Sequence, residues 1–214
     1  MAYDFDGTND YIQAPLGTSY NVPISIACWF NSDTTNANKT LVTLAIGLVG
    51  QTTSNGFHLR ITSGAQVQAT IANGAGSNSA AVGTYTLQNW HHGAAVFYTT
   101  GSRYAFCDAV RSSQSSTVRT VNVNPSNLLI GQGSGGDFNL PQPYNGRIAE
   151  VGVWNVGLTD AEIAILAKGI KPIYVRPESL LYYVPLVRDI NDHVGGLEFT
   201  YEVIGDAAHS RRYG

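Results

Sequence analysis

The sequence predicts an all-β protein in which two antiparallel sheets form a sandwich, accompanied by one short helix and a C-terminal extension. Charged residues make up 13% of the 214 residues, well below the roughly 25% of a typical soluble domain. The polar surface must therefore come from Ser, Thr, Asn, Gln and 23 glycines, a composition that favours strands and turns over exposed helices. Short runs with a period of two, separated by Gly, Asn and Ser clusters, indicate strands joined by turns.

The strands are expected at short intervals along the chain. Alternating apolar and polar residues predict a hairpin in which residues 57–62 and 66–71 flank a Ser-Gly turn. The polar face of this hairpin, which carries His58, is expected to face solvent. A second hairpin is expected over residues 90–110. The remaining strands are predicted at residues 10–14, 24–30, 40–46, 117–123, 127–131 and 146–154.

One helix is predicted, over residues 159–168. Thr159 and Glu162 form a capping box, because the Thr159 hydroxyl can accept from the amide three residues on and Glu162 can reach back to the Thr159 amide. Gly169 then supplies the C-terminal stop. A single short helix in an all-β chain suits a connector that packs on a sheet.

The amino-acid pattern changes at Pro172. The run RPESLLYYVPLVRDI is apolar but is interrupted by Pro185, which favours an edge strand or an extended arm. Residues 196–204 favour a further strand. We therefore expect a two-sheet sandwich over residues 1–171, including the capped helix, and an extension over residues 172–214 that adds edge strands and mediates assembly.

Charge and composition exclude several classes of function. The net charge is −3 and no Lys/Arg stripe is present, so a nucleic-acid partner is not expected. The first residues show neither the basic nor the apolar region of a signal peptide, and no apolar run approaches the roughly 18 residues of a membrane span. Cys28 and Cys107 fall within predicted strands, where two buried free thiols and a disulfide are open alternatives.

Several segments, taken in order, resemble one family. FDGTNDYI at residues 5–12, ISIACWF at 24–30 and NWHHGAAVFY at 89–98 are similar to strands of laminin-G-like jelly rolls, although Ala109 stands where a turn glycine is usual. NGRIAEVGVWNVGLTDAEIAILAKG at 145–169 resembles the closing strand and capped helix of that family. The resemblance implies a two-sheet antiparallel jelly roll of the concanavalin A/laminin-G kind. The pattern VRPESLLYYVPL in the extension resembles the tail of jelly-roll proteins from tailed-phage structural modules, which implies a virion component.

The residues form no catalytic pattern. Glycosidases of this fold carry acids at alternate positions of one strand, so that two carboxylates flank the sugar bond, whereas Glu150 is the lone acid of its strand. No Gly-x-Ser-x-Gly elbow is present, and the pattern places no histidine beside Cys107. His91 and His92 are adjacent in a strand and point to opposite faces, so they cannot chelate one ion together. Asp33 and the other loop aspartates lack the dense oxygen cluster of a calcium site. We expect no enzyme, no metal and no other cofactor.

Two sets of residues are candidates for binding. An exposed aromatic ring beside amide groups suits a sugar, and Phe138, Asn139 and Tyr144 in the Gly-rich loop fit that description. A loop anchored by its own aromatic rings is the alternative. In a lone monomer the apolar extension would either pack on the sandwich or form an exposed patch. Its candidate interface residues are Leu180, Leu181, Tyr182, Tyr183, Leu186, Phe199, Tyr201, Arg211 and Arg212.

These observations favour a non-enzymatic protein of the virion surface, in particular a capsid decoration protein that stabilises the head by binding the shell through its arm and sheet edges. The expected partners are the major capsid protein or other virion proteins and further copies of the chain, with trimers among the expected oligomers. Assembly is expected in the host cytoplasm, and no membrane partner is expected. The alternative is a carbohydrate-binding receptor or adhesion module of a phage tail, with a surface glycan as its ligand. A glucanase-like hydrolase is the third alternative.

Overall fold

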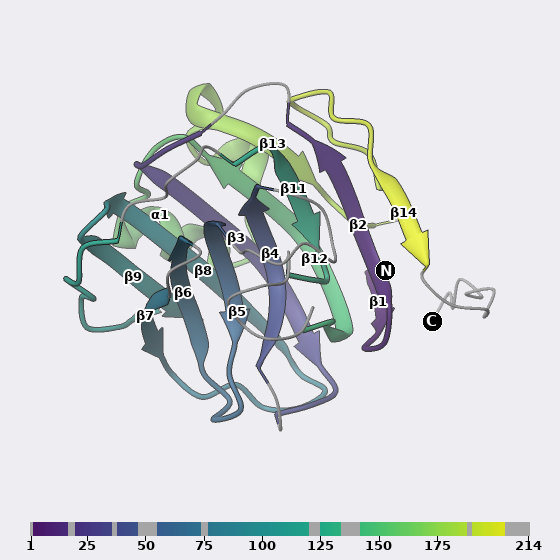
Figure 1. The fold of residues 1–214 in the computed structure, drawn as a ribbon, viewed down its shortest axis with the longest axis horizontal. Coiled ribbons are helices and arrows are strands. Elements are labelled where there is room, and N and C mark those ends of the chain that lie inside the picture. Colours follow the sequence, from purple (N-terminus) through teal and green to yellow (C-terminus); the bar gives the residue numbers. More distant parts are fainter. Residues whose placement is uncertain are drawn as a thin grey trace.

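Two antiparallel sheets of seven strands each form the protein (Figure 1). This computed structural model describes residues 2–16, 20–35, 38–46, 55–73, 77–119, 125–133, 142–187 and 190–203. The arrangement confirms the predicted fold class, an all-β sandwich of two antiparallel sheets with one short α-helix among the described residues.

Sheet A has the strand order β1-β12-β3-β8-β9-β10, and β13 pairs with β12 as well. The long strand β12 pairs with β1 along its first half and with β13 along its second half, while β3 lies on its other side. The strands are β1 (Tyr3–Asp6), β3 (Ile24–Ser32), β8 (Trp90–Thr99), β9 (Ser102–Cys107), β10 (Val110–Arg111), β12 (Asn145–Trp154) and β13 (Leu180–Val184).

Sheet B has the strand order β14-β2-β11-β4-β5-β6-β7. The hairpin predicted at residues 57–71 is confirmed as β5 and β6, in which Leu59 pairs with Ala69. The strands are β2 (Asp10–Pro15), β4 (Lys39–Ala45), β5 (Asn55–Ile61), β6 (Val67–Asn73), β7 (Ser77–Val82), β11 (Asn127–Ile130) and β14 (Thr200–Val203).

The main core lies between the sheets. Along β3, alternate side chains point inward, which places Cys28 and Phe30 in the same buried cluster as Val42 and Phe57 of sheet B. Cys28 and Cys107 are both buried and both free, so the free-thiol alternative is confirmed. Burial raises the pKa of the Cys107 thiol to about 12, and the group stays neutral at physiological pH.

A second apolar cluster covers part of the outer side of sheet A. The helix α1 (Asp160–Ala167) buries Ile163 and Leu166 there, together with Trp154, whose indole N–H donates to the Val175 carbonyl at 2.8 Å. The predicted capping box is confirmed: the Thr159 amide donates to the Glu162 carboxylate at 2.8 Å and the Thr159 hydroxyl accepts from the Glu162 amide at 3.3 Å. Two 3₁₀ turns follow, η1 (Pro172–Tyr174) and η2 (Pro177–Ser179).

The segment after η2 joins both sheets. β13 pairs with β12 in sheet A, and β14 pairs with β2 at the edge of sheet B, where the yellow arrow of β14 lies beside the purple β2 in Figure 1. The strand predicted at 117–123 is not formed over residues 117–119, and residues 120–124 lie outside the described residues. No helix in the described part of the chain has the length and apolarity needed to cross a membrane.

Candidate functional site

An aromatic and amide surface lies on the outer side of sheet A, where two neighbouring strands bring four side chains together. In the register of β3 and β8, Trp29 is opposite His92 and Asn31 is opposite Trp90. Phe30, between Trp29 and Asn31, points into the main core. Because side chains alternate along a strand, Trp29 and Asn31 therefore point to the outer side of the sheet.

The neighbouring strand β12 extends this surface with a cation. Arg147 is opposite Asn31 on one side and opposite Asp4 of β1 on the other. One row across sheet A is therefore Asp4, Arg147, Asn31 and Trp90. We call Trp29, Asn31, Trp90, His92 and Arg147 the tryptophan face.

The tryptophan face combines accessible rings with buried polar atoms. Trp90 is 42% exposed, Arg147 is exposed and Trp29 is half-buried. Asn31 and His92 are buried, and neither Asn31 Oδ1 nor His92 Nδ1 has a hydrogen-bond partner among the described residues. A buried polar atom left unpaired typically costs about 1–3 kcal/mol, so a hydroxyl that paired with either atom would recover part of this cost.

Burial keeps the His92 ring neutral. Desolvation lowers its pKa to about 4, against a smaller opposing effect of the Asp108 carboxylate. The ring packs edge-on against Trp29, with their centroids 5.6 Å apart. A neutral imidazole has one nitrogen that donates and one that accepts, so His92 can hydrogen-bond to a hydroxyl group in either direction.

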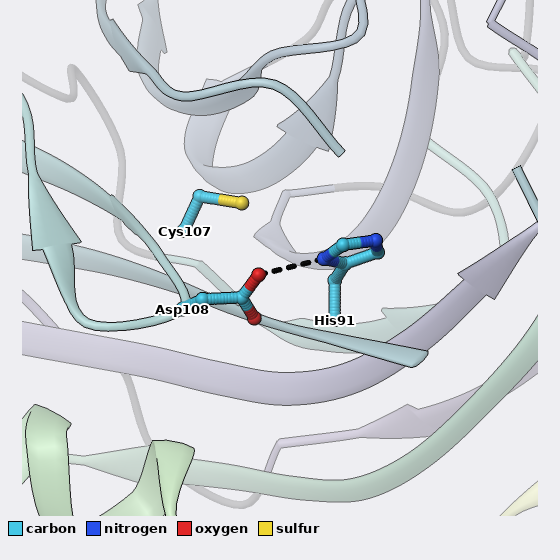
Figure 2. Close-up of side chains that lie close together, drawn as sticks. All are labelled: His91, Cys107 and Asp108. Carbon is cyan, nitrogen blue, oxygen red and sulfur yellow. Dashed lines mark hydrogen bonds and ion pairs between the residues drawn. The ribbon is translucent and has the colours of Figure 1, made fainter. Parts of the chain in front are cut away.

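The Asp108 carboxylate fixes the start of β8. One oxygen lies 2.6 Å from His91 Nδ1 (Figure 2). The other oxygen accepts from the His92 amide at 2.8 Å. Asp108 and Ala109 both have positive φ, 49° and 67°, as a tight two-residue hairpin turn requires. Ala109 therefore adopts the backbone conformation for which the family uses glycine. This turn holds the His92 backbone in position.

His91, Cys107 and Asp108 form a cluster of potential metal ligands, with their ligand atoms within 4.8 Å of one another. The Thr86 amide donates to His91 Nε2 at 3.0 Å, so the ring proton lies on Nδ1 and faces Asp108. Figure 2 shows Cys107 on this Nδ1 side, away from Nε2. A catalytic thiol needs a free imidazole nitrogen to take its proton, and neither nitrogen is available. Within this cluster, His91 and Asp108 form a hydrogen-bonded pair that fixes the start of β8.

The polar outer side of sheet B differs from its prediction. His58, expected to face solvent, is completely buried, and its Nδ1 lies 2.9 Å from the Thr43 hydroxyl. Arg60, next on the same face, is also buried and donates to Gln142 and, at 3.4 Å, to Gln68. Desolvation, aided by the Arg60 charge, lowers the pKa of His58 to about 3. Alternation identified the face correctly, but a period of two does not show what covers that face.

The predicted sugar-binding residues do not form a site among the described residues. Tyr144 is fully buried, with its ring 6.3 Å from that of Phe5, so it cannot stack on a ligand, and the alternative of an anchoring aromatic ring is correct for it. Phe138 and Asn139 lie outside the described residues.

Four of the nine predicted interface residues are part of the core. Leu180, Tyr182, Tyr183 and Leu186 are buried within the chain, which contradicts their assignment as partner contacts. Their burial follows from the pairing of β13 with β12. Leu181 and Phe199 are partly buried against the main core. The backbone of Tyr201 pairs with Ile12, and Arg211 and Arg212 lie outside the described residues.

The tryptophan face was not predicted, although its signal is present in the sequence. In ISIACWFN, the alternation that buries Cys28 and Phe30 leaves Trp29 and Asn31 on the opposite face. A large aromatic ring on the face opposite the core is the feature of the sequence that could have indicated this surface. The sequence does not show the register of β3 with β8 and β12, and it is this register that brings the five residues together.

The two packed antiparallel sheets define a β-sandwich of the jelly-roll class. A laminin-G-type family model described as the concanavalin A-like lectin/glucanases superfamily matches residues 6–164, and the chain belongs to this superfamily. The predicted family is thereby confirmed. No curated protein matches the sequence.

Solved structures share the fold at low sequence identity. A heptameric SAP-like pentraxin from Limulus polyphemus is 12% identical, with 94% of this chain and 90% of that chain covered and a TM-score of 0.64. A putative carbohydrate-binding protein from Bacteroides ovatus is 18% identical, with 96% and 60% covered and a TM-score of 0.64. The CBM40 domain of the Ruminococcus gnavus IT-sialidase is 15% identical, with 78% and 98% covered and a TM-score of 0.55.

Proposed function

We propose that the protein is a non-catalytic carbohydrate-binding domain and that the tryptophan face is its ligand site. The observation that carries the proposal is the placement of Asn31 and His92, each with a buried unpaired polar atom, between Trp29 and Trp90. The C–H face of a sugar ring is apolar and packs on an indole, while its hydroxyls need hydrogen-bond partners at the ring edge. The tryptophan face offers both kinds of contact.

The kinds of protein that share the fold support this proposal. Two of the similar structures are a putative carbohydrate-binding protein and a carbohydrate-binding module. The acids also fit a binding role, because Glu150 accepts from the Tyr183 hydroxyl at 2.6 Å and no second carboxylate of β12 lies beside it. A glycosidase needs two such groups around the sugar bond.

Glycan binding by the full chain tests the proposal. We expect the wild-type protein to bind a subset of glycans on an array and Trp90→Ala to bind the same glycans more weakly, because Trp90 is the more exposed ring. Tyr174→Ala is the matched control, since Tyr174 is an aromatic residue that is 71% exposed and lies in η1. A wild-type protein that binds no glycan, or a Trp90→Ala variant that binds as well as wild type, would refute the proposal.

The place of the protein on a virion stays a prediction. Burial of Leu180, Tyr182, Tyr183 and Leu186 removes the apolar arm that motivated shell binding, whereas a receptor or adhesion role needs only the tryptophan face. Immunogold electron microscopy of purified particles with antibodies to the chain would test this location. Labelling of tails would fit a receptor module, and labelling of heads would fit decoration.

A further inference from the structure

We propose, on the basis of the carbohydrate-binding function above, that the tryptophan face binds an uncharged oligosaccharide through two consecutive sugar units. The inference concerns the class of glycan and comes from two further observations: the diagonal placement of the two tryptophans, and the charges around them.

The two tryptophans lie on a diagonal of neighbouring strands. Trp29 is directly opposite His92, and Trp90 is two residues before His92 on the same strand. Diagonal neighbours in an antiparallel pair are about 7–8 Å apart. Because the two indoles stand on different strands and in different rows of the sheet, we place one sugar unit on each, and two linked units then use the whole surface.

The two unpaired polar atoms occupy the other diagonal. Asn31 and His92 are the remaining corners of the four-residue block, and each lies next to both tryptophans. A sugar ring packed on Trp29 or on Trp90 would therefore bring hydroxyls near both the Asn31 amide oxygen and the His92 Nδ1. Because the neutral His92 ring and the Asn31 amide carry no net charge, their natural partners are hydroxyl groups.

The charges around the block disfavour an anionic sugar. Arg147 is the cation of the tryptophan face, and it stands opposite the Asp4 carboxylate in the register of β1 and β12. On the His92 side of the block, Asp108 accepts from the His92 amide, and its side chain is 48% exposed. A carboxylate or sulfate on the ligand would meet these acids with one cation to offset them, and like charges at close range are unfavourable.

The test compares neutral and sialylated forms of the same glycans. The best neutral glycan from an array is measured by calorimetry with the full chain as its monosaccharide, disaccharide and trisaccharide, and then as its sialylated counterpart. We expect about tenfold tighter binding from one unit to two, consistent with a second aromatic contact, and weaker binding once sialic acid is added. Trp29→Ala and Trp90→Ala should each reduce the gain from the second unit, with Tyr174→Ala unchanged.

The outcomes separate this inference from the proposed function. Equal affinity for the monosaccharide and the disaccharide, or tighter binding of the sialylated form, would overturn the inference while leaving carbohydrate binding intact. Because Trp29 is half-buried and its removal can affect folding, Arg147→Gln, at an exposed position, provides a second variant. It removes the cation of the tryptophan face, and it should further weaken binding of the sialylated form relative to the neutral one; an unchanged ratio would also overturn the inference.

Discussion

The stability of the protein should fall steeply under mild acid because of His58 and His92. Both are buried, and their pKa values are lowered to about 3 and about 4 from an ordinary value of 6.5. As the pH falls below 6.5, these histidines take up protons in the unfolded chain before they do so in the folded one. The folded state therefore loses stability from pH 6.5 down to about pH 4 for His92 and about pH 3 for His58.

The size of the effect follows from the linkage between pKa and stability. One pKa unit corresponds to 1.36 kcal/mol, so at pH 4.5, about two units below the ordinary pKa, each histidine costs about 2–3 kcal/mol. The two together cost about 5 kcal/mol, a large part of the roughly 5–15 kcal/mol that stabilises a typical domain. The free energy of unfolding should therefore be much smaller at pH 4.5 than at pH 7.

Urea unfolding at pH 7.5 and pH 4.5 measures this loss. Carboxylates also titrate in this interval, so the useful quantity is the difference between variants. His58→Gln and His92→Gln should each make the loss about 2–3 kcal/mol smaller than in wild type, because each removes one group that takes up a proton on unfolding. Ile165→Ala, at a position that is 42% exposed and does not ionise, is the control and should lose as much as wild type. If both histidine variants lost as much stability as wild type, the assigned burial would be wrong.

Three further predictions concern other parts of the molecule. Thr159→Ala should lower the free energy of unfolding by about 1 kcal/mol through loss of the capping box, measured by urea titration; an unchanged midpoint would contradict the cap. Truncation after Lys171 should yield an unfolded or aggregated chain by circular dichroism, because β13 and its buried side chains are removed; a folded body would show that the extension is dispensable. Cys28 and Cys107 should react with a thiol reagent only at the rate of unfolding, since both are buried and the pKa of each is raised; rapid reaction of the native protein would argue against their burial.

The sequence was sufficient wherever the structure follows from local rules. The capping box of Thr159 and Glu162 and the hairpin of β5 and β6 were predicted correctly, because both depend on residues a few positions apart. Burial of His58 was not predicted, since it depends on segments that come from elsewhere in the chain. In the extension, the expected added strands are formed as β13 and β14. An apolar run shows that a segment needs to be covered, but not that β12 is its partner.

In the candidate site, too, local rules place each residue on its strand, but contacts between distant strands decide which residues meet. Each residue of the tryptophan face can be placed on the outer side of its strand by alternation with buried neighbours such as Phe30. The grouping of Trp29 with His92 and of Asn31 with Trp90 and Arg147 requires the register between three strands, and β12 lies more than a hundred residues further along the chain than β3. Contacts of such long range leave no periodic signal in the sequence.

The position of β13 and β14 in the chain bears on how the protein is made. A ribosome releases these strands after all the others of both sheets, so a nascent chain that ends before them leaves one side of β2 unpaired and one side of the second half of β12 unpaired. Unpaired strand edges readily pair with other chains. Final closure of the sandwich is therefore an event that follows synthesis of the body, and the interval before it is when the growing polypeptide most needs protection by a chaperone.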